Sequence, residues 1–165
     1  MYNCKKVIIV SEIIGNIIKP IEAIAPLSYQ ESYDNAGLQI GNINDIVSSV
    51  LLCIDVTEEV IDEAITLGAG LIISHHPLIF NGIKRLTGAN YVERCVVKAI
   101  KNNIAIYSAH TNLDAAYNGV NAKISEKLSL HNVSVLAPIH NDLIKIIVYV
   151  PNSHAENVRT AMFDA

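Results

Sequence analysis

Two short motifs in this sequence carry side chains that could bind a metal ion. Residues 74–77 (SHHP) contain two adjacent histidines, and residues 110–114 (HTNLD) contain a histidine four residues before an aspartate. Imidazole is the commonest neutral metal ligand, and a mixture of imidazole and carboxylate suits Zn²⁺, Mn²⁺, Fe²⁺, Co²⁺ or Ni²⁺ better than Mg²⁺ or Ca²⁺. The sequence therefore predicts a divalent-metal site whose candidate ligands are His75, His76, His110 and Asp114.

The two adjacent histidines can reach one ion only where a strand ends, because neighbouring residues of a regular strand point to opposite faces. Pro77 favours such an end, since it donates no ladder hydrogen bond and biases His76 toward an extended backbone. The alternative is a plain strand terminus with one buried and one exposed histidine.

His110 and Asp114 would share one face of a helical turn, because residues i and i+4 are neighbours on a helix. The alternative role for Asp114 is a helix cap beside Ala115 and Ala116. Four protein ligands could close one tetrahedral ion, or they could be the incomplete shell of a two-metal site, which needs further ligands.

A turn-rich segment at residues 28–41 could support the site. Within it, Asp34 or Asn35 could orient a ligand histidine through a hydrogen bond. The pattern DNAG by itself favours an Asx-type turn with Gly37 at a positive φ.

A basic loop at residues 81–88 (NGIKRLTG) follows the first motif. Its Lys84 and Arg85 could hold an anionic substrate near the metal, or they could simply be solvated. The remaining histidines have no ligand spacing with an acid and are expected at the surface: His131, His140 and His154.

Strands and helices are predicted to alternate along the chain. Apolar runs indicate buried strands at residues 50–56, 71–74 and 104–108. Periodicity and capping signals predict helices at residues 11–25, 58–67, 91–102 and 120–128. This order is typical of βαβ units with a parallel sheet, in which ligands gather beyond the carboxyl ends of the strands. Both histidine motifs follow a strand, so they are expected at one edge.

Capping residues and prolines set the expected helix limits. Ser11 is the predicted N-cap of the first helix, which Pro20 should kink or split. Thr57 is the predicted N-cap of the second helix, and Gly68 suits the position after its end.

Composition excludes several classes of protein. The chain has 165 residues, of which 51% are hydrophobic and 17% charged, so it can bury a core. Its net charge of −4 and scattered Lys and Arg residues argue against nucleic-acid partners. No apolar stretch approaches the roughly 20 residues needed to span a membrane. The three cysteines, Cys4, Cys53 and Cys95, show no CxxC spacing, so neither a disulfide framework nor a cysteine zinc site is expected. This use of cysteine suits the reducing cytoplasm, where we expect the protein to be located.

The pattern changes after residue 128. Residues 131–142 resemble a linker, residues 144–150 predict a strand ending at Pro151, and residues 154–164 predict a helix. We expect residues 1–140 to form one α/β domain and residues 141–165 to begin a second, incomplete unit.

The combined motifs resemble the Nif-three-like dinuclear metal centre hexameric proteins, often named GTP cyclohydrolase 1 type 2 homologues. The resemblance covers roughly residues 10–130 and lies in four stretches in the family's order, namely 25–27 (APL), 30–38 (QESYDNAGL), 74–80 (SHHPLIF) and 110–114 (HTNLD). Tyr33 stands where many members carry Trp, which keeps an aromatic ring with a polar handle.

This resemblance implies an α/β fold with a mixed, largely parallel sheet flanked by helices, incomplete in this chain. It implies two divalent ions per subunit in a homohexamer, with the four candidate residues as ligands. The family completes its site with a His and a Glu four residues later, and no such pair follows Asp114 here. Residues 145–159 look like the opening of a PII/CutA-like inserted domain, so the chain is expected to be the N-terminal part of a longer protein.

Three hypotheses follow. The first is a metal-dependent hydrolase in which two ions share a bridging water and act on a small anionic or nucleotide substrate such as GTP; no P-loop or GxGxxG is present to select a nucleotide. The second is a non-catalytic metal-binding regulatory or scaffold protein that acts through protein partners. The third is a fragment that neither binds metal tightly nor folds alone.

Overall fold

The computed structural model describes residues 5–136 and 146–164. These residues belong to two units, Met1–His131 and Asn132–Ala165. The boundary expected between residues 140 and 141 lies outside the described residues, as do His140 and Cys4.

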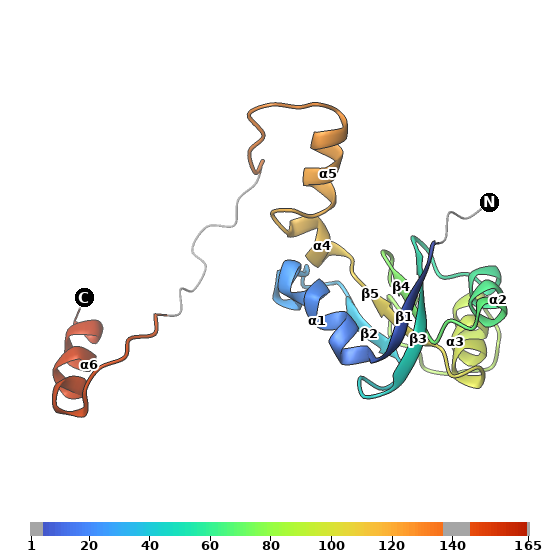
Figure 1. Cartoon of the computed structure of the whole chain (residues 1–165), viewed down its shortest axis with the longest axis horizontal. Coiled ribbons are helices and arrows are strands. Elements are labelled where there is room, and N and C mark those ends of the chain that lie inside the picture. The colour runs from blue at the N-terminus through green and yellow to red at the C-terminus, as the bar shows by residue number, and fades with distance from the viewer. Residues whose placement is uncertain (1–4, 137–145, 165) are drawn as a thin grey trace. The chain divides into compact units, whose positions relative to one another are not determined.

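A five-stranded mixed sheet forms the centre of the first unit (Figure 1). The strands lie in the order β1-β3-β4-β5-β2. Their bounds, in that order, are Lys5–Ile13, Ile46–Cys53, Leu71–Ser74, Ala105–Ser108 and Gly37–Ile40. The central β3, β4 and β5 are parallel, whereas β1 and β2 run antiparallel to their neighbours. The predicted α/β class with a mixed sheet flanked by helices is confirmed.

Helices bury both faces of this sheet (Figure 1). Glu58–Leu67 (α2) and Tyr91–Lys101 (α3) cover one face, and Ile14–Ile24 (α1) covers the other. In β4, Leu71 packs in the core under α1, and the next residue, Ile72, packs in the core under α2 and α3. Burial on both sides explains why the parallel strands are continuous apolar runs.

The predicted ends of α2 are confirmed. Thr57 caps its start by accepting a hydrogen bond from Val60 N at 3.3 Å. Gly68 ends it in the left-handed conformation at φ 65°, which glycine adopts without steric cost. These local signals place β4 directly after α2.

The predicted start of α1 is wrong. Strand β1 continues to Ile13, so the helix begins at Ile14 and Ser11 is not its N-cap. Pairing of Ile13 with Ile46 of β3 explains the difference, because ladder bonds hold this segment extended. Pro20 lies inside α1 and does not split it.

Strand β2 was not predicted, because its residues lie in the turn-rich segment 28–41. A 3₁₀ turn at Leu27–Tyr29 precedes it, and Gly37 starts the strand at φ 111°, the positive value expected. Gly37 pairs with Ser108, so the antiparallel β2 begins beside the carboxyl end of β5. The loop before β2 is thereby brought to the edge where the histidine motifs lie.

Two helices follow β5, namely Thr111–Ala115 (α4) and Val120–Lys127 (α5). The second unit contains the 3₁₀ turn Asn152–His154 and the helix Ala155–Phe163 (α6), close to the predicted helix. The predicted strand at 144–150 is not found over 146–150, and residues 144 and 145 lie outside the described residues. A strand needs ladder bonds from a neighbour, and the described part of this unit offers no other strand. No described helix is both long and apolar enough to cross a bilayer.

Glu93 holds the loop that leads into α3. Its carboxylate accepts hydrogen bonds from Thr87 N at 2.8 Å, Thr87 Oγ1 at 2.9 Å and Ala89 N at 3.1 Å. The amide and hydroxyl of Thr87 hold the pKa of Glu93 below its ordinary value of 4.5. The ionised carboxylate therefore stabilises the folded loop.

Glu93→Gln is expected to lower the urea midpoint at pH 7 and to lower it less at pH 3. Because the pKa of Glu93 is lower in the folded chain, its stabilisation is present above 4.5 and is lost as the pH falls through the folded value. Urea titrations of both proteins between pH 7 and pH 3 measure this, with Glu63→Gln on the exposed side of α2 as control. A loss of equal size at both ends of the range would contradict the assignment.

Candidate metal centre

The parallel register brings the ends of β3, β4 and β5 into one row. Cys53 pairs with Ser74, and Ser74 pairs with Ser108. The residues two positions beyond this row are Asp55, His76 and His110. The two motifs therefore meet at one edge of the sheet, as predicted.

Backbone hydrogen bonds maintain this alignment after the strands end. His75 N donates to Cys53 O at 3.2 Å, and His76 N donates to Ile54 O at 2.9 Å. Pro77, which has no N–H, follows immediately and ends the ladder. Both histidines are thus held at a strand terminus, where adjacent side chains can turn to the same site.

Two buried serines, Ser74 and Ser108, hold the backbone of His76 through hydrogen bonds. Ser74 Oγ donates to His76 O at 2.9 Å and lies 2.8 Å from Ser108 Oγ. A hydroxyl has one hydrogen, and Ser74 uses its own on the carbonyl, so Ser108 donates to Ser74. The chain Ser108–Ser74–His76 ties β5 to the histidine pair of β4.

Three histidines form the centre itself. One ring nitrogen from each of His75, His76 and His110 lies within 4.8 Å of the others. The ring centroids are 4.9 Å apart for the first two, and His110 lies 5.4 Å from His75 and 5.6 Å from His76. The structure thus brings together the three histidines that the sequence singled out.

Each of these imidazoles is hydrogen-bonded through Nδ1 to an oxygen. The partners are Ala109 O for His75, Asp55 Oδ1 for His76 and Asp34 Oδ1 for His110, at 2.8, 2.7 and 2.8 Å. A carbonyl or carboxylate oxygen accepts the bond, so Nδ1 carries the proton of each neutral ring. Every Nε2 then keeps a lone pair available for a metal ion.

Asp34 is the acceptor that connects most groups. Its Oδ1 also accepts from Asn35 N at 2.7 Å, and its Oδ2 accepts from the backbone N–H and the hydroxyl of Thr111. Burial raises the pKa of Asp34, but the hydrogen bonds from Thr111, His110 and Asn35 together hold it below its ordinary value. Asp34 is therefore a buried carboxylate that orients His110, in addition to forming its own turn.

Asp55 was missed as a site residue. It lies inside the apolar run at residues 50–56 that predicted a buried strand, and β3 ends before it at Cys53. Its carboxylate orients His76, as described above. The usable signal is its position: a carboxylate two residues past a parallel strand lies at the edge where ligands gather.

Asp114 lies beside the three histidines but outside their group. Its Oδ1 is 3.8 Å from His75 Nε2, and 38% of its side chain is exposed. Two atoms that bind one zinc ion at about 2.0–2.2 Å lie at most about 4.4 Å apart, so this spacing allows a shared ion. The alternative of a helix cap is wrong, because His110 and Ala116 occupy the cap positions of α4.

A buried amide attaches His110 to the rest of the unit. Asn112, with no exposed surface, accepts from His110 N at 2.9 Å and donates to Ala25 O at 2.7 Å. It links the turn that carries the candidate ligand His110 to the end of α1. Both side-chain groups of Asn112 are therefore used.

The family model of Duf34/NIF3 (NGG1p interacting factor 3) matches residues 13–161. The chain belongs to the Duf34/NIF3 family. It is 44% identical over 150 residues to the GTP cyclohydrolase 1 type 2 homolog of Bacillus subtilis, covering 90% of this chain and 40% of that protein. The homolog of the same name from Halalkalibacterium halodurans is 42% identical over 147 residues, covering 88% and 40%.

A solved structure supports the same relationship. The crystal structure of a Bacillus cereus protein related to NIF3 superimposes with a TM-score of 0.74 at 44% identity, over 93% of this chain and 43% of that one. The chain thus spans about 40% of the length of the curated NIF3 relatives it matches.

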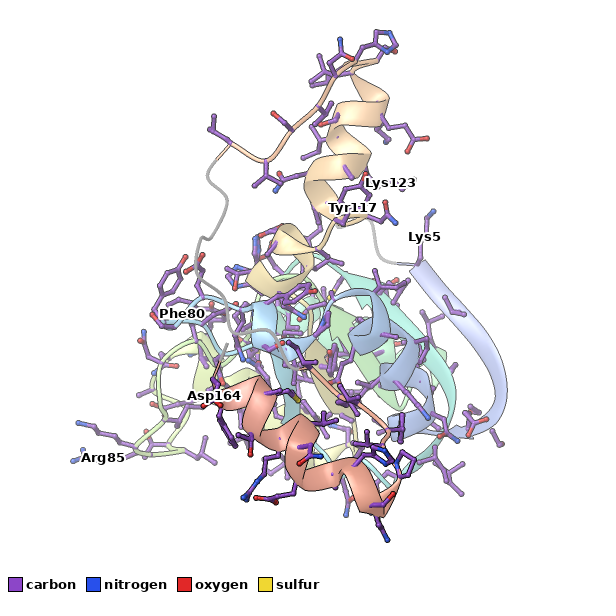
Figure 2. The ribbon with its side chains drawn as sticks, turned by 90° about the vertical axis from the view of Figure 1, so that its left-hand side faces the viewer. Lys5, Phe80, Arg85, Tyr117, Lys123 and Asp164 are labelled. Atoms are coloured by element: carbon purple, nitrogen blue, oxygen red, sulfur yellow. The ribbon has the colours of Figure 1, made fainter. Side chains whose placement is uncertain are left out.

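Among the described residues of this NIF3-family chain, no hydrogen bond or ion pair joins Lys84 or Arg85 to the three histidines. Lys84 and Arg85 are exposed, and Figure 2 shows Arg85 pointing outward from its loop. His131 and His154 are exposed as expected. The structure therefore does not bring the two basic residues into the group of histidines.

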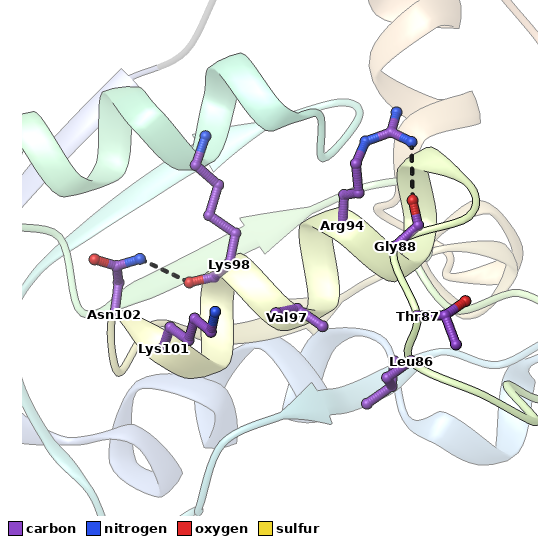
Figure 3. A pocket seen from close by; sticks show the side chains of 8 residues that line it. All are labelled: Leu86, Thr87, Gly88, Arg94, Val97, Lys98, Lys101 and Asn102. Carbon is purple, nitrogen blue, oxygen red and sulfur yellow. Dashed lines mark hydrogen bonds between the residues drawn. The ribbon is translucent and has the colours of Figure 1, made fainter.

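Two hollows on the surface of the described residues bear on the site. One, of about 250 Å³, adjoins the centre and is lined by Asp55, Val56, Thr57, His76, Pro77, Leu78 and Tyr91. The other, of about 330 Å³, lies between α3 and the loop before it (Figure 3). Its Arg94 and Lys98 are neutralised by Glu58 and Asp62, at 2.9 and 2.6 Å. Only the first hollow can serve the candidate metal centre.

Asn112→Ala is expected to lower the free energy of unfolding by about 2–4 kcal/mol, because His110 N and Ala25 O would lose their partner in a buried position. Urea denaturation followed by circular dichroism measures the change. Asn118→Ala, at an exposed position of the next turn, is the matched control and should change stability by less than about 0.5 kcal/mol. Equal effects of the two variants would show that the buried amide has no special role.

Proposed function

We propose that this centre binds divalent transition-metal ions and that the complete protein uses it as a two-metal hydrolase. The ligands are His75, His76, His110 and Asp114. The observation that supports this most strongly is the set of Nδ1 hydrogen bonds, which leaves all three Nε2 lone pairs available within one small group.

The donor set fits such an ion. Three neutral imidazoles whose lone pairs face a common space repel one another, and a cation between them removes that repulsion. Imidazole with one carboxylate suits Zn²⁺, Mn²⁺, Fe²⁺, Co²⁺ or Ni²⁺. Carboxylates that accept from the remote nitrogen of a ligand histidine are the usual support of metal sites, which is the arrangement of Asp34 and Asp55.

The residues of the chain have separate tasks in this proposal. Ions bound here would act as Lewis acids and lower the pKa of water in the site. Asp34 and Asp55 fix the rings of His110 and His76, and Ala109 O fixes His75. Asp114 supplies the carboxylate oxygen of the ligand set, and its Oδ1 lies 3.8 Å from His75 Nε2. Two ions need more ligands than these four, so the reaction is proposed for the complete protein.

The substrate class in this proposal is a nucleotide, in keeping with the relatives named GTP cyclohydrolase 1 type 2 homolog. We further propose a homohexamer in the cytoplasm.

Replacing a ligand histidine is expected to remove bound metal. His75→Ala, His76→Ala and Asp114→Ala should each lower affinity for Zn²⁺ at least about tenfold, because each removes one donor. Metal content of the purified protein by mass spectrometry and Zn²⁺ titration against a chelating dye measure this. The controls His131→Ala and His154→Ala remove exposed histidines and should keep wild-type metal content. If all five variants retain it, the ligand assignment is wrong.

The complete protein is expected to hydrolyse GTP only when metal is bound. Dialysis against a chelator should abolish turnover, and adding back Zn²⁺, Mn²⁺, Fe²⁺, Co²⁺ or Ni²⁺ should restore it. Product formation is followed by chromatography, with the His75→Ala protein as a control for contaminating activity. A protein that binds metal but shows no chelator-sensitive turnover of GTP, other nucleotides or phosphoesters would be a non-catalytic metal-binding protein.

A further inference from the structure

Two aromatic side chains form a row that leads away from the centre. The ring of Phe80 meets that of His110 edge-on, with centroids 6.3 Å apart and planes at 88°. Tyr33 lies next, with its centroid 6.4 Å from that of Phe80 and planes at 54°. We name Tyr33 and Phe80 together the aromatic platform.

Both side chains of the platform are exposed to solvent. Tyr33 is 65% exposed and Phe80 is 43% exposed, although both rings are large enough to bury 150–250 Å². Exposure alone decides nothing, since exposed apolar residues are common on protein surfaces. The distinguishing feature is how firmly the backbone under these two rings is held.

Side chains hold both polar groups of the residue before Phe80. Ile79 N donates to Gln39 Oε1 at 3.0 Å. Ile79 O accepts from Asn35 Nδ2 at 2.6 Å and from Gln39 Nε2 at 3.3 Å. Gln39 also donates to Asn35 O at 2.8 Å. The segment carrying Phe80 is thus bound to the segment carrying Tyr33.

The same segment is bound to the centre. Tyr33 directly precedes Asp34, the carboxylate that orients His110. The backbone segments that carry the two rings are therefore held relative to each other and to a candidate ligand before any substrate arrives. Such preorganisation lowers the entropic cost of binding.

The hollow of about 250 Å³ that adjoins the centre differs from the platform in its polarity. It lies beside His76 and contains the carboxylate of Asp55 and the polar side chains of Thr57 and Tyr91. No Lys or Arg lines it, so it offers hydrogen bonds rather than an apolar surface or a phosphate site. The platform is an exposed aromatic surface beside the histidines. Because its two rings are inclined at 54°, a flat heterocyclic ring could stack on one of them and meet the other edge-on.

We propose that Tyr33 and Phe80 determine specificity by stacking a planar heteroaromatic ring of the substrate beside the histidine centre. This inference rests on the proposed function, because it places the substrate at that centre. Phe80 contacts His110, so a ring stacked on the platform lies within reach of ions held by the histidines.

The test uses the complete protein loaded with Zn²⁺ and two probes, guanosine and ribose, which differ by the planar ring. Calorimetric titration should show binding of guanosine and at least tenfold weaker binding of ribose. Tyr33→Leu and Phe80→Leu keep an apolar side chain but lose the π-face, and each should weaken guanosine about tenfold. Tyr33→Trp and Phe80→Tyr keep a ring and should retain binding.

Matched controls are Tyr149→Leu and Phe163→Leu, exposed residues of the same types in the second unit. They should bind guanosine like the wild type. Metal content is measured in every sample. If the wild-type protein does not retain metal, the proposed function is wrong. If both Leu variants retain metal and bind guanosine as tightly as the wild type, only the role of the platform is wrong. Equal affinity for guanosine and ribose, or equal losses in the controls, would also overturn it.

Discussion

The parallel register of β3, β4 and β5 is the constraint on which the centre depends. Because Cys53, Ser74 and Ser108 lie in one row, the chain segments that leave these strands start level with one another. Backbone bonds then carry the alignment past the last ladder residue to His76. A slip of one residue in any strand would turn its whole set of side chains to the opposite face, so the packing of two apolar cores also fixes where the imidazoles lie.

The antiparallel β2 adds what the parallel strands cannot supply. Starting at Gly37 beside Ser108, it delivers Asp34 to the far side of His110. The same loop supplies Asn35 and, through it, the support of the segment around Ile79. One short edge strand thus orients a candidate ligand and holds an exposed aromatic surface next to it. A substitution that weakened this strand would disturb both features without touching a metal ligand.

Local signals predicted the parts of the structure that local forces determine. The cap and end of α2 and the strand at 71–74 were recognisable because each depends on neighbours in sequence. The three histidines were recognisable because each of their two motifs follows an apolar strand. Strand β2 has only four residues, of which the first is a glycine at positive φ, and its pairing with β5 joins residues about 70 positions apart. The contacts of Asp34 and Asp55 with histidines follow from such long-range pairing. The apolar run at 146–150 shows the converse: its pattern suits a strand, but in the described residues it has no partner.

The centre also explains why so many polar groups are buried around it. Three imidazoles with one ring nitrogen each inside 4.8 Å are a crowded polar arrangement, which would relax unless the surrounding structure opposed it. Here the opposition comes from Asp34, Asn112 and the Ser74–Ser108 pair, each fully hydrogen-bonded inside the unit. An ion that binds only the folded chain would stabilise it in proportion to its affinity. Because hydrogen bonds already orient the rings, binding an ion would require little rearrangement, which favours affinity. The hydrogen bonds that stabilise the fold around the centre would therefore also orient the metal ligands.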